Sequence, residues 1–434
     1  MRIAVIGAGV SGLGAAYALK ERHEVTLFEK ERRLGGHANT LAIDYDGARI
    51  AVDTGFIVYN KRNYPNLAAL FEHLGVPSFV SDMSFAVSDP DGWEWSSNGL
   101  SGLFAWKRNM ADAGFLCLLG DIVKFSAQAR ADLKLDRING VTLEDYVAGL
   151  RLSRGFLSQY LLPMGAAIWS TPEQDMLRYP ATSFLRFFEN HRLLHLIRPF
   201  WRSVEGGSRT YVEALRHALG PRVQTGDAVV SVARVASGVE LRRASGDVQM
   251  FDHAVLACHA DEAHAILKGY DAEHAALSAI RYAPNTAYLH RDAALMPRRK
   301  AAWASWNYLR SRDNPGRVCV TYWMNKLQRI RRDRPLFVTL NPAAAPAPEL
   351  TFARLVYDHP QFDAPALAAQ AQIARLQGRD RIWFAGAWTG HGFHEDGLAS
   401  GLAVAARLGA PAPWSKAPAP PQPAPALEPA RAAA

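Results

Sequence analysis

Three glycines near the N-terminus have the spacing of a turn that binds a dinucleotide. Gly7, Gly9 and Gly12 follow a short apolar run, residues 2–6, of the kind that forms a buried parallel strand. The first glycine allows a tight turn, the second lets the backbone approach a pyrophosphate, and the third lets a helix pack closely on the strand. A helix that begins at this turn would offer free N–H groups and the positive end of its dipole to the phosphates.

An acidic residue follows at the distance that such a site requires. Glu29 ends a second strand-like run, residues 24–28, about twenty residues after the glycine turn, where a carboxylate accepts hydrogen bonds from a ribose diol. An accidental glycine turn would not need this acid. A secretory signal, which Arg2 before an apolar run could suggest, fits less well because glycines interrupt the run. We therefore expect a dinucleotide site in an intracellular protein that keeps its N-terminus.

A second pair of glycines, Gly35 and Gly36, lies just beyond Glu29 in the segment 32–37. With this segment the sequence resembles the flavin-containing amine oxidase superfamily, in which an Arg-x-Gly-Gly-Arg-like stretch lies along FAD. His37 stands where that superfamily usually has arginine. An Asp-x-Gly segment of the superfamily is matched by residues 53–55. The resemblance therefore implies FAD as the dinucleotide, and we expect it to be non-covalent because no cysteine or histidine has a spacing that suggests a covalent link.

The C-terminal segment 381–397 resembles the flavin end of the same superfamily. A strand meets a glycine turn, and a helix at 398–408 then directs its N-terminus at the reduced flavin. The superfamily usually has Gly-Asp where this chain has Gly386-Ala387, and the resemblance therefore implies that the usual contact of that aspartate to the ribityl chain is not made here. The residues predicted to bind FAD are Gly7, Gly9, Ser11, Gly12, Glu29, Lys30, Gly35, Gly36, His37, Thr54, Gly55, Val229, Val230, Gly386, Ala387, Asp396, Gly397 and Leu398.

The resemblance extends over residues 1–408 and implies the fold. We expect a Rossmann-like α/β FAD-binding domain of the amine-oxidase type, with an interleaved α+β substrate domain of mixed sheet and helices. The predicted FAD-binding domain is discontinuous and comprises 1–75, 200–265 and 375–412, and the substrate domain comprises 76–199 and 266–374. Within the latter, 84–88 and 93–96 predict a hairpin, and Ser183 is a candidate cap for a helix over 184–198. The tail 413–434 is rich in alanine and proline, which predicts disorder.

Charge is concentrated in one segment of an otherwise near-neutral chain. Residues 298–334 contain eleven Lys or Arg and two Asp, a net charge of +9, whereas the whole chain has +8. Aromatic residues interleave with these cations, which suits an anionic membrane surface; a solvated face with its aromatics in the core is the main alternative. No nucleic-acid-binding motif accompanies the segment. We expect a cytoplasmic protein, with this segment as its peripheral contact to the inner face of the cell membrane.

Two further features limit the class of protein. The longest apolar stretches, such as 115–119, are too short to cross a bilayer. The three cysteines are far apart, which indicates a reducing compartment and no metal site. Only one dinucleotide fingerprint is present, so no NAD(P)H site is evident. These features favour an oxidase or dehydrogenase whose flavin is reduced by the substrate itself.

The substrate is predicted from resemblance alone. Residues 305–308, 321–325 and 392–397 look like a bacterial subgroup that is associated with cyclopropane-fatty-acid-synthase-like methyltransferases and with methylated and furan fatty acids. The resemblance implies a dehydrogenase or desaturase that acts on unsaturated or methylated fatty acyl chains of membrane phospholipids, with hydride passing to flavin N5. The alternatives are an oxidase of small amines or polyamines, and a non-catalytic flavin- or lipid-binding protein. The sequence does not predict the oligomeric state.

The candidate catalytic bases lie beside the expected flavin edge. His394 and Glu395 are the two that we single out. Each has a structural alternative: Glu395 would cap a helix, and His394 would hydrogen-bond to the backbone of a turn.

Overall fold

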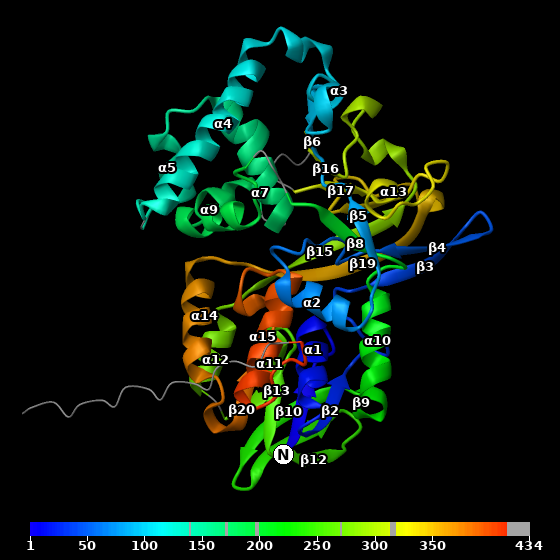
Figure 1. Ribbon diagram of the computed structural model, residues 1–434, viewed down its shortest axis with the longest axis vertical. Coiled ribbons are helices and arrows are strands. Elements are labelled where there is room, and N and C mark those ends of the chain that lie inside the picture. Colours follow the sequence, from blue (N-terminus) through cyan, green and yellow to red (C-terminus); the bar gives the residue numbers. More distant parts are fainter. Residues whose placement is uncertain (139, 170–171, 196–198, 270, 313–317, 415–434) are drawn as a thin grey trace, which may run out of the picture.

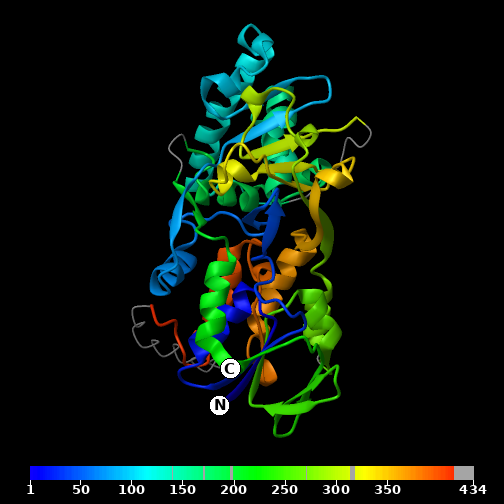
Figure 2. The same cartoon turned by 90° about the vertical axis from the view of Figure 1, so that its right-hand side faces the viewer.

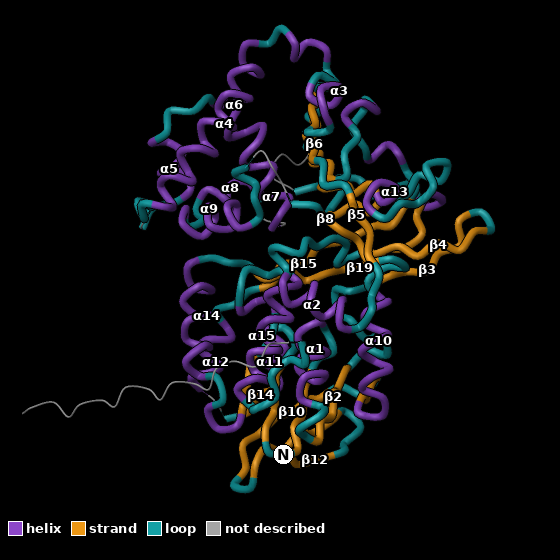
Figure 3. Tube along the Cα trace, viewed as in Figure 1, coloured by secondary structure: helices purple, strands orange, loops and turns teal. Residues whose placement is uncertain are grey.

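The computed structural model describes residues 1–138, 140–169, 172–195, 199–269, 271–312 and 318–414. These residues form two parts, one above the other along the long axis (Figure 1). The lower part holds the N-terminus and is built on a parallel sheet. The upper part combines a mixed sheet with a group of helices (Figures 2 and 3). Segments from distant parts of the sequence contribute to both parts, so the predicted interleaving is confirmed.

A five-stranded parallel sheet forms the centre of the lower part, in the order β20-β13-β1-β2-β9. Val5 in the middle strand lies opposite Leu27 on one side and Val255 on the other. Both faces of this strand are covered, which is why residues 3–6 are apolar without alternation. The strands are β1 (Arg2–Ile6), β2 (Glu24–Glu29), β9 (Val223–Thr225), β13 (His253–Leu256) and β20 (Ile382–Phe384).

Helices cover one face of this sheet, and glycines let them approach closely. The helices are α1 (Val10–Leu19), α2 (Pro65–His73), α10 (Arg209–Leu219) and α15 (His394–Arg407). Every residue of α1 is buried. A Cβ atom on Gly401 of α15 would overlap the carbonyl oxygen of Ser11, and one on Gly12 would overlap that of Gly7. Only glycine at these positions lets α15 lie against α1 at the glycine turn.

The opposite face of the sheet corrects the predicted domain boundaries. It carries a four-stranded sheet and three helices: β10 (Val229–Val235), β11 (Gly238–Arg243), β12 (Val248–Phe251), β14 (Leu267–Lys268), α11 (Ala260–Ile266), α12 (Asp271–Ser278) and α14 (Ala364–Leu376). The predicted boundaries leave α12 and α14 in the substrate domain. Instead Leu277 and Ile373 pack into the same core as Leu256 and Phe384. These helices belong to the lower part because their apolar faces bury this side of the parallel sheet.

A seven-stranded mixed sheet runs through the upper part in the order β19-β15-β18-β17-β16-β6-β7. The predicted hairpin is confirmed, since β6 pairs antiparallel with β7 and Val87 lies opposite Trp95. The strands are β6 (Phe85–Ser88), β7 (Glu94–Ser96), β15 (Tyr282–His290), β16 (Trp306–Leu309), β17 (Val320–Trp323), β18 (Phe337–Leu340) and β19 (Thr351–Pro360). Two ribbons, β3 (Thr40–Tyr45) with β4 (Ala48–Asp53) and β5 (Ser78–Ser81) with β8 (Trp201–Val204), complete the strands.

The helices of the upper part are α3 (Gly99–Leu103), α4 (Ala113–Lys134), α5 (Leu143–Gly149), α6 (Arg154–Phe156), α7 (Leu162–Trp169), α8 (Glu173–Leu177), α9 (Ala181–Asn190) and α13 (Met324–Leu327). A π-helical turn, Leu157–Leu161, joins α6 to α7. Pro163 has no N–H to donate to the carbonyl of Gln159, which accepts a hydrogen bond from the Trp95 indole instead. No helix within the described residues is both long and apolar enough to span a bilayer.

The predicted helix over 184–198 is wrong at both ends. The helix α9 begins at Ala181, directly after Pro180, and it ends at Asn190. Arg192 has a φ of +57°, which a continuing helix does not allow. The last predicted residues, 196–198, lie outside the described residues. The early end places His191 in a loop, where its ring is free to face the interior of the molecule.

Candidate active site

A cavity of about 780 Å³ is lined by residues of both parts. The lower part contributes both glycine turns and the start of α15, and the upper part contributes side chains from α7, α9 and the mixed sheet. Gly9 and Glu29 lie at one end of this lining, and we call that the nucleotide end. Most of the apolar upper-part residues of the lining share one hydrophobic core. We call their end the apolar chamber; its lining includes Met83, Phe85, Met164, Ile168, Phe187, His191, Leu193, Trp201, Trp306, Tyr322, Leu340 and Phe393.

The nucleotide end has the form that a pyrophosphate needs. Gly7 has a φ of +101°, and a Cβ atom there would lie 2.7 Å from the carbonyl oxygen of Ala257. At Gly9, which precedes α1, no heavy atom lies within 4 Å of the position that a Cβ would take, so the backbone borders open space. Gly36 comes from the second turn, and its Cβ position lies 3.2 Å from the Cα of Gly9. The two glycine turns therefore form one cradle beside the helix N-terminus, and this cradle fits the pyrophosphate of FAD.

Glu29 is held in place for a ribose. Its Oε2 accepts a hydrogen bond from the N–H of Ala8 at 2.8 Å, and its Oε1 accepts one from the N–H of Glu31 at 3.0 Å. Each carboxylate oxygen keeps a second lone pair for a diol. The carboxylate lines the cavity, as the distance from the glycine turn predicts.

The other predicted cofactor residues divide into two groups. Those that line the cavity are Gly7, Gly9, Ser11, Glu29, Lys30, Gly35, Gly36, His37, Thr54, Gly55, Val229, Gly386 and Ala387. Val230 does not line it, because its side chain points outward and is 43% exposed. Asp396, Gly397 and Leu398 also lie behind the lining, where Asp396 accepts a hydrogen bond from the N–H of Phe393 at 2.9 Å and caps α15. These residues and Gly12 position α1 and α15 rather than face the cavity.

His37 has histidine and tyrosine neighbours in place of acidic ones. Its ring centroid lies 5.2 Å from that of Tyr357, 5.5 Å from that of His359 and 6.0 Å from that of His259. Burial and the neighbouring histidines hold the pKa of His37 well below its usual range. Burial also lowers the pKa of His359 to about 4. At neutral pH the rings of His37 and His359 are uncharged.

Glu395, on α15, forms hydrogen bonds to the N-terminus of another helix, α2. Its Oε1 accepts hydrogen bonds from the N–H and the Nδ2 of Asn66 at 2.9 and 2.7 Å, and its Oε2 accepts one from the N–H of Leu67 at 3.0 Å. These N–H groups belong to the first turn of α2, where no intrahelical partner exists. Glu395 is outside the cavity lining. Its position supports the capping alternative, at α2 rather than at α15, and not the role of a proton acceptor.

His394 does line the cavity, but its chemistry differs from the prediction. Its ring stacks on Phe56 with centroids 3.9 Å apart, and its Nε2 lies 2.6 Å from the hydroxyl of Tyr211. Tyr211 is fully buried, so its O–H has to donate to Nε2, and the ring then carries its proton on Nδ1. Burial lowers the pKa of His394 to about 3. The side chain is therefore a neutral hydrogen-bond donor at physiological pH, and its Nε2 is already occupied.

The apolar chamber contains a polar residue that the sequence did not indicate. His191 stacks on Phe187, with ring centroids 3.8 Å apart, and its Nδ1 lies 3.1 Å from the carbonyl oxygen of the same residue. Burial lowers its pKa to about 4. The predicted helix over 184–198 concealed this residue, because within a helix its neighbours would have been other helical side chains. The one available signal was a histidine among closely spaced aromatic residues.

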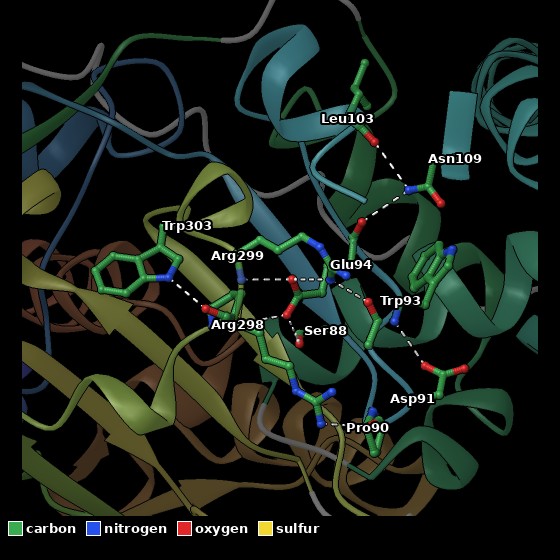
Figure 4. Close-up of polar contacts among 12 residues, drawn as sticks. Ser88, Pro90, Asp91, Trp93, Glu94, Leu103, Asn109, Arg298, Arg299 and Trp303 are labelled. Atoms are coloured by element: carbon green, nitrogen blue, oxygen red, sulfur yellow. Dashed lines mark hydrogen bonds and ion pairs between the residues drawn. The ribbon is translucent and has the colours of Figure 1, made fainter. Parts of the chain in front are cut away.

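The basic segment 298–334 is tied to the interior by backbone N–H groups and by a few of its cations. Glu94 has a fully buried carboxylate, and it accepts hydrogen bonds from the backbone N–H of Arg298 at 2.6 Å and of Arg299 at 3.1 Å (Figure 4). Arg310 pairs with Asp89 and Glu173. Several of the aromatic residues lie in the core: Tyr308, Tyr322, Trp303 and Trp306 are buried or half-buried. This arrangement favours a structural role for much of the segment, and its contact with a membrane stays a prediction.

No group of three or more metal-ligating side chains occurs among the described residues.

The family model for flavin containing amine oxidoreductases matches residues 10–290. The chain belongs to this family. The flavoenzyme is therefore an FAD-dependent oxidoreductase, and the cavity is where its residues would hold FAD.

Solved structures share the fold of the flavoenzyme at low sequence identity. A fatty acid isomerase from P. acnes is 14% identical with a TM-score of 0.65, and the match covers 94% of this chain and 98% of the isomerase. Cyclohexylamine oxidase from Brevibacterium oxydans IH-35A is 16% identical with a TM-score of 0.65, over 94% and 99% of the two chains. These similarities confirm an amine-oxidase-type α/β fold with a second, mixed domain.

Curated relatives match over shorter stretches. The carotenoid phi-ring synthase of Streptomyces griseus is 28% identical over 166 residues, which is 34% of this chain and 31% of that protein. A 4,4'-diapophytoene desaturase of Staphylococcus aureus (strain Newman) is 56% identical over 45 residues, or 10% of this chain and 9% of the desaturase. The matched regions span a third or less of these relatives, so the activities in their names are not carried over to the flavoenzyme.

Proposed function

We propose that the flavoenzyme dehydrogenates unsaturated or methylated fatty acyl chains of membrane phospholipids. The observation that carries the proposal is the character of the apolar chamber. Its lining is hydrocarbon, thioether and aromatic, and none of the chamber residues named above carries a carboxylate. Burial of an alkyl chain in such a lining contributes about 0.8 kcal/mol per methylene. The relatives named for fatty acid and carotenoid chemistry agree with a long apolar substrate.

The electrostatics of the cavity weigh against a cationic substrate. The acidic residues of the lining are Glu29, Glu31, Glu262 and Asp358. Glu29 accepts hydrogen bonds from the N–H groups of Ala8 and Glu31, Glu262 pairs with Lys30, and both Glu31 and Asp358 are exposed to solvent. An ammonium group in the chamber would therefore lose its hydration without gaining a carboxylate partner, which is costly.

FAD, when bound, accepts the hydride that the substrate gives up. The residues of this chain provide the rest of what the reaction needs. The glycine cradle and Glu29 hold the dinucleotide, the chamber excludes water and aligns an alkyl chain, and the start of α15 borders both. Exclusion of water also protects a carbon centre that becomes electron-poor as hydride leaves.

A second candidate function is oxidation of amines, and the aromatic lining is the observation that favours it. Trp306 and Tyr322 meet edge to face with centroids 5.0 Å apart, and Trp201 lies near His191. Aromatic faces of this kind attract cations. The family match does not separate the two substrates, because one fold serves many reactions.

Anaerobic absorbance of the FAD-loaded protein tests the proposal. We expect vesicles of dioleoyl phosphatidylglycerol, or of a methyl-branched phospholipid, to bleach the flavin band. Putrescine and cyclohexylamine should leave it unchanged. Bleaching by an amine but by no lipid would establish the amine oxidase, and a band that no donor changes would favour a non-catalytic flavin-binding protein.

A further inference from the structure

His191 is the one imidazole of the apolar chamber. It lies directly after α9, and its ring is held between aromatic side chains: Phe187 at 3.8 Å, Phe393 at 5.5 Å and Trp201 at 6.5 Å between ring centroids. The rings of Phe187 and Trp201 lie within 26° and 17° of the plane of the imidazole. Phe393 directly precedes α15, whose N-terminus borders the cofactor cradle. His191 is therefore fixed in orientation and faces the same cavity as the cofactor.

The hydrogen bond of His191 determines which ring nitrogen carries the proton. Nδ1 lies 3.1 Å from the carbonyl oxygen of Phe187, and a carbonyl oxygen only accepts. Nδ1 must therefore be the donor. Burial lowers the pKa of this imidazole to about 4, so the ring is neutral at physiological pH and Nε2 has a lone pair. Among the hydrogen bonds of the described residues, the His191 ring takes part only through Nδ1.

The candidate acceptors at the start of α15 are already engaged. The carboxylate of Glu395 binds three N–H groups of α2, and Nε2 of His394 accepts from Tyr211. Asp396 caps its own helix through the N–H of Phe393. The lone pair of Nε2 makes no hydrogen bond within the described residues, and the atom is not among those closed off from solvent without a partner. It is available to a substrate.

We propose that Nε2 of His191 accepts the proton that the substrate loses when its carbon–carbon bond is oxidised. This assignment rests on the proposed function. Two C–H bonds on neighbouring carbons break and one π bond forms between those carbons. One hydrogen leaves as hydride and carries two electrons to FAD, which is the oxidant. The other leaves as a proton to Nε2, and the resulting imidazolium returns it to water when the chamber opens to release the product.

The environment of His191 suits this role. As hydride leaves, positive charge develops on the carbon that loses it. The C–H bonds of the next carbon then become strongly acidic, so a weak base with a low pKa is sufficient. A stronger base would be protonated before the substrate arrived. The face of Phe187, which stacks on the imidazole at 3.8 Å, stabilises the positive charge of the imidazolium once it forms. His391 is the nearby titratable group that acts on His191, and it is exposed to solvent.

The variant His191→Phe tests the assignment because it keeps a flat ring for stacking and removes the lone pair. The matched control is His217→Phe, which makes the same change at an exposed position on α10. Single-turnover bleaching of the FAD-loaded protein by dioleoyl phosphatidylglycerol vesicles is measured without oxygen. We expect the bleaching rate of His191→Phe to fall by about 10²-fold or more, as loss of a general base does. FAD affinity and the apparent affinity for lipid should stay within about twofold of the wild type, and the control should bleach at the wild-type rate.

A second measurement does not depend on turnover. Ring ¹⁵N chemical shifts of the histidines, with His191 assigned by its absence in His191→Phe, report which nitrogen carries the proton. We expect a protonated Nδ1 and an unprotonated Nε2 at pH 7. The opposite tautomer, or equal bleaching rates for His191→Phe and the wild type, would overturn the assignment. If no lipid bleaches the wild type, the proposed function fails instead, and the same pair of variants is compared with whichever amine does reduce the flavin.

Discussion

The nucleotide end of the cavity is made of backbone, whereas the apolar chamber is made of side chains. At the nucleotide end, Gly9 and Gly36 bring two turns together and Glu29 is fixed by N–H groups. The chamber instead collects single residues from many segments, such as Phe85, Met164 and Tyr322. A common cofactor can be held by a fixed backbone shape, while side chains can change without altering that shape. We therefore expect the chemistry common to the family to depend on the first end and the choice of substrate on the second.

The largest expected effect comes from a substitution that disrupts the nucleotide end. In Gly12→Val the new side chain would overlap the carbonyl oxygen of Gly7, so α1 could no longer pack against the glycine turn. We expect the purified protein to contain no FAD and to unfold at a lower temperature. The control is Gly120→Ala on the exposed face of α4, where a Cβ meets no atom within 4 Å. FAD content from absorbance decides the outcome, and normal FAD content in Gly12→Val would refute the role of this contact.

The second-largest effect is expected from a charge placed in the apolar chamber, a change that leaves the nucleotide end intact. Ile168→Glu places a carboxylate in the apolar lining. An unpaired buried charge is costly, so we expect lipid-driven bleaching to slow by at least about tenfold, whereas a cationic amine would gain a partner. The variant Ile168→Gln has a side chain of the same shape as glutamate but without its charge. It therefore separates the effect of the charge from the effect of the changed shape. Unchanged lipid turnover in Ile168→Glu would show that the alkyl chain binds elsewhere.

A third change tests whether the upper part depends on its buried carboxylate. Glu94→Gln keeps the size of the side chain but removes the charge that holds the N–H groups of Arg298 and Arg299 and the guanidinium of Arg299. Loss of a buried, hydrogen-bonded charge costs about 3 kcal/mol. We expect a lower unfolding temperature with an unchanged flavin spectrum, because the nucleotide end is not touched. A change in the FAD spectrum would mean that the two ends are coupled through this network.

Acidification should destabilise both ends through their histidines. The pKa of His394 is lowered to about 3 and that of His191 to about 4, both below the unfolded value of 6.5. A folded-state pKa below the unfolded one means that the unfolded chain binds the additional proton, so this stability is present above pH 6.5 and is lost as the pH falls towards 4. Each group should contribute a loss of about 2 kcal/mol between pH 7 and pH 5.

Urea unfolding of the FAD-free protein at the two pH values measures this loss. The variant His191→Phe should show a shallower pH dependence than the wild type, since one of the contributing groups is gone. An equal pH dependence in the two proteins would mean that His191 titrates normally in the folded state.

The smallest effect concerns the basic segment. Arg331 pairs with Asp333 at the surface and Arg332 lies over the Trp323 ring, and both cations are exposed to solvent. We expect the double variant Arg331→Ser/Arg332→Ser to bind vesicles of anionic phosphatidylglycerol about fivefold more weakly, because Asp333 already neutralises Arg331 and one remaining cation contributes roughly 1 kcal/mol near the surface. Sedimentation with neutral phosphatidylcholine vesicles is the control. Equal binding by the variant and the wild type would remove the segment from the membrane proposal.

The order of residues 2–36 was sufficient to predict the parallel strands, the glycine turns, Glu29 and the dinucleotide site, because these depend on neighbours in the sequence. The hairpin of β6 and β7 was predictable for the same reason. The sequence did not predict that α12 and α14 cover the parallel sheet, since that depends on which core needs their apolar faces. It also extended the helix α9 past residue 190, and so it missed His191.

The roles of polar side chains were decided by tertiary structure alone. Glu395 and His394 are neighbours in sequence, yet one binds the first turn of α2 and the other lies against Phe56 and Tyr211 in the cavity wall. A carboxylate or an imidazole acquires its chemistry from burial and from the partners that reach it, and those partners come from residues hundreds of positions away. Local sequence therefore determined the cofactor site, and long-range packing determined which side chains are free to react.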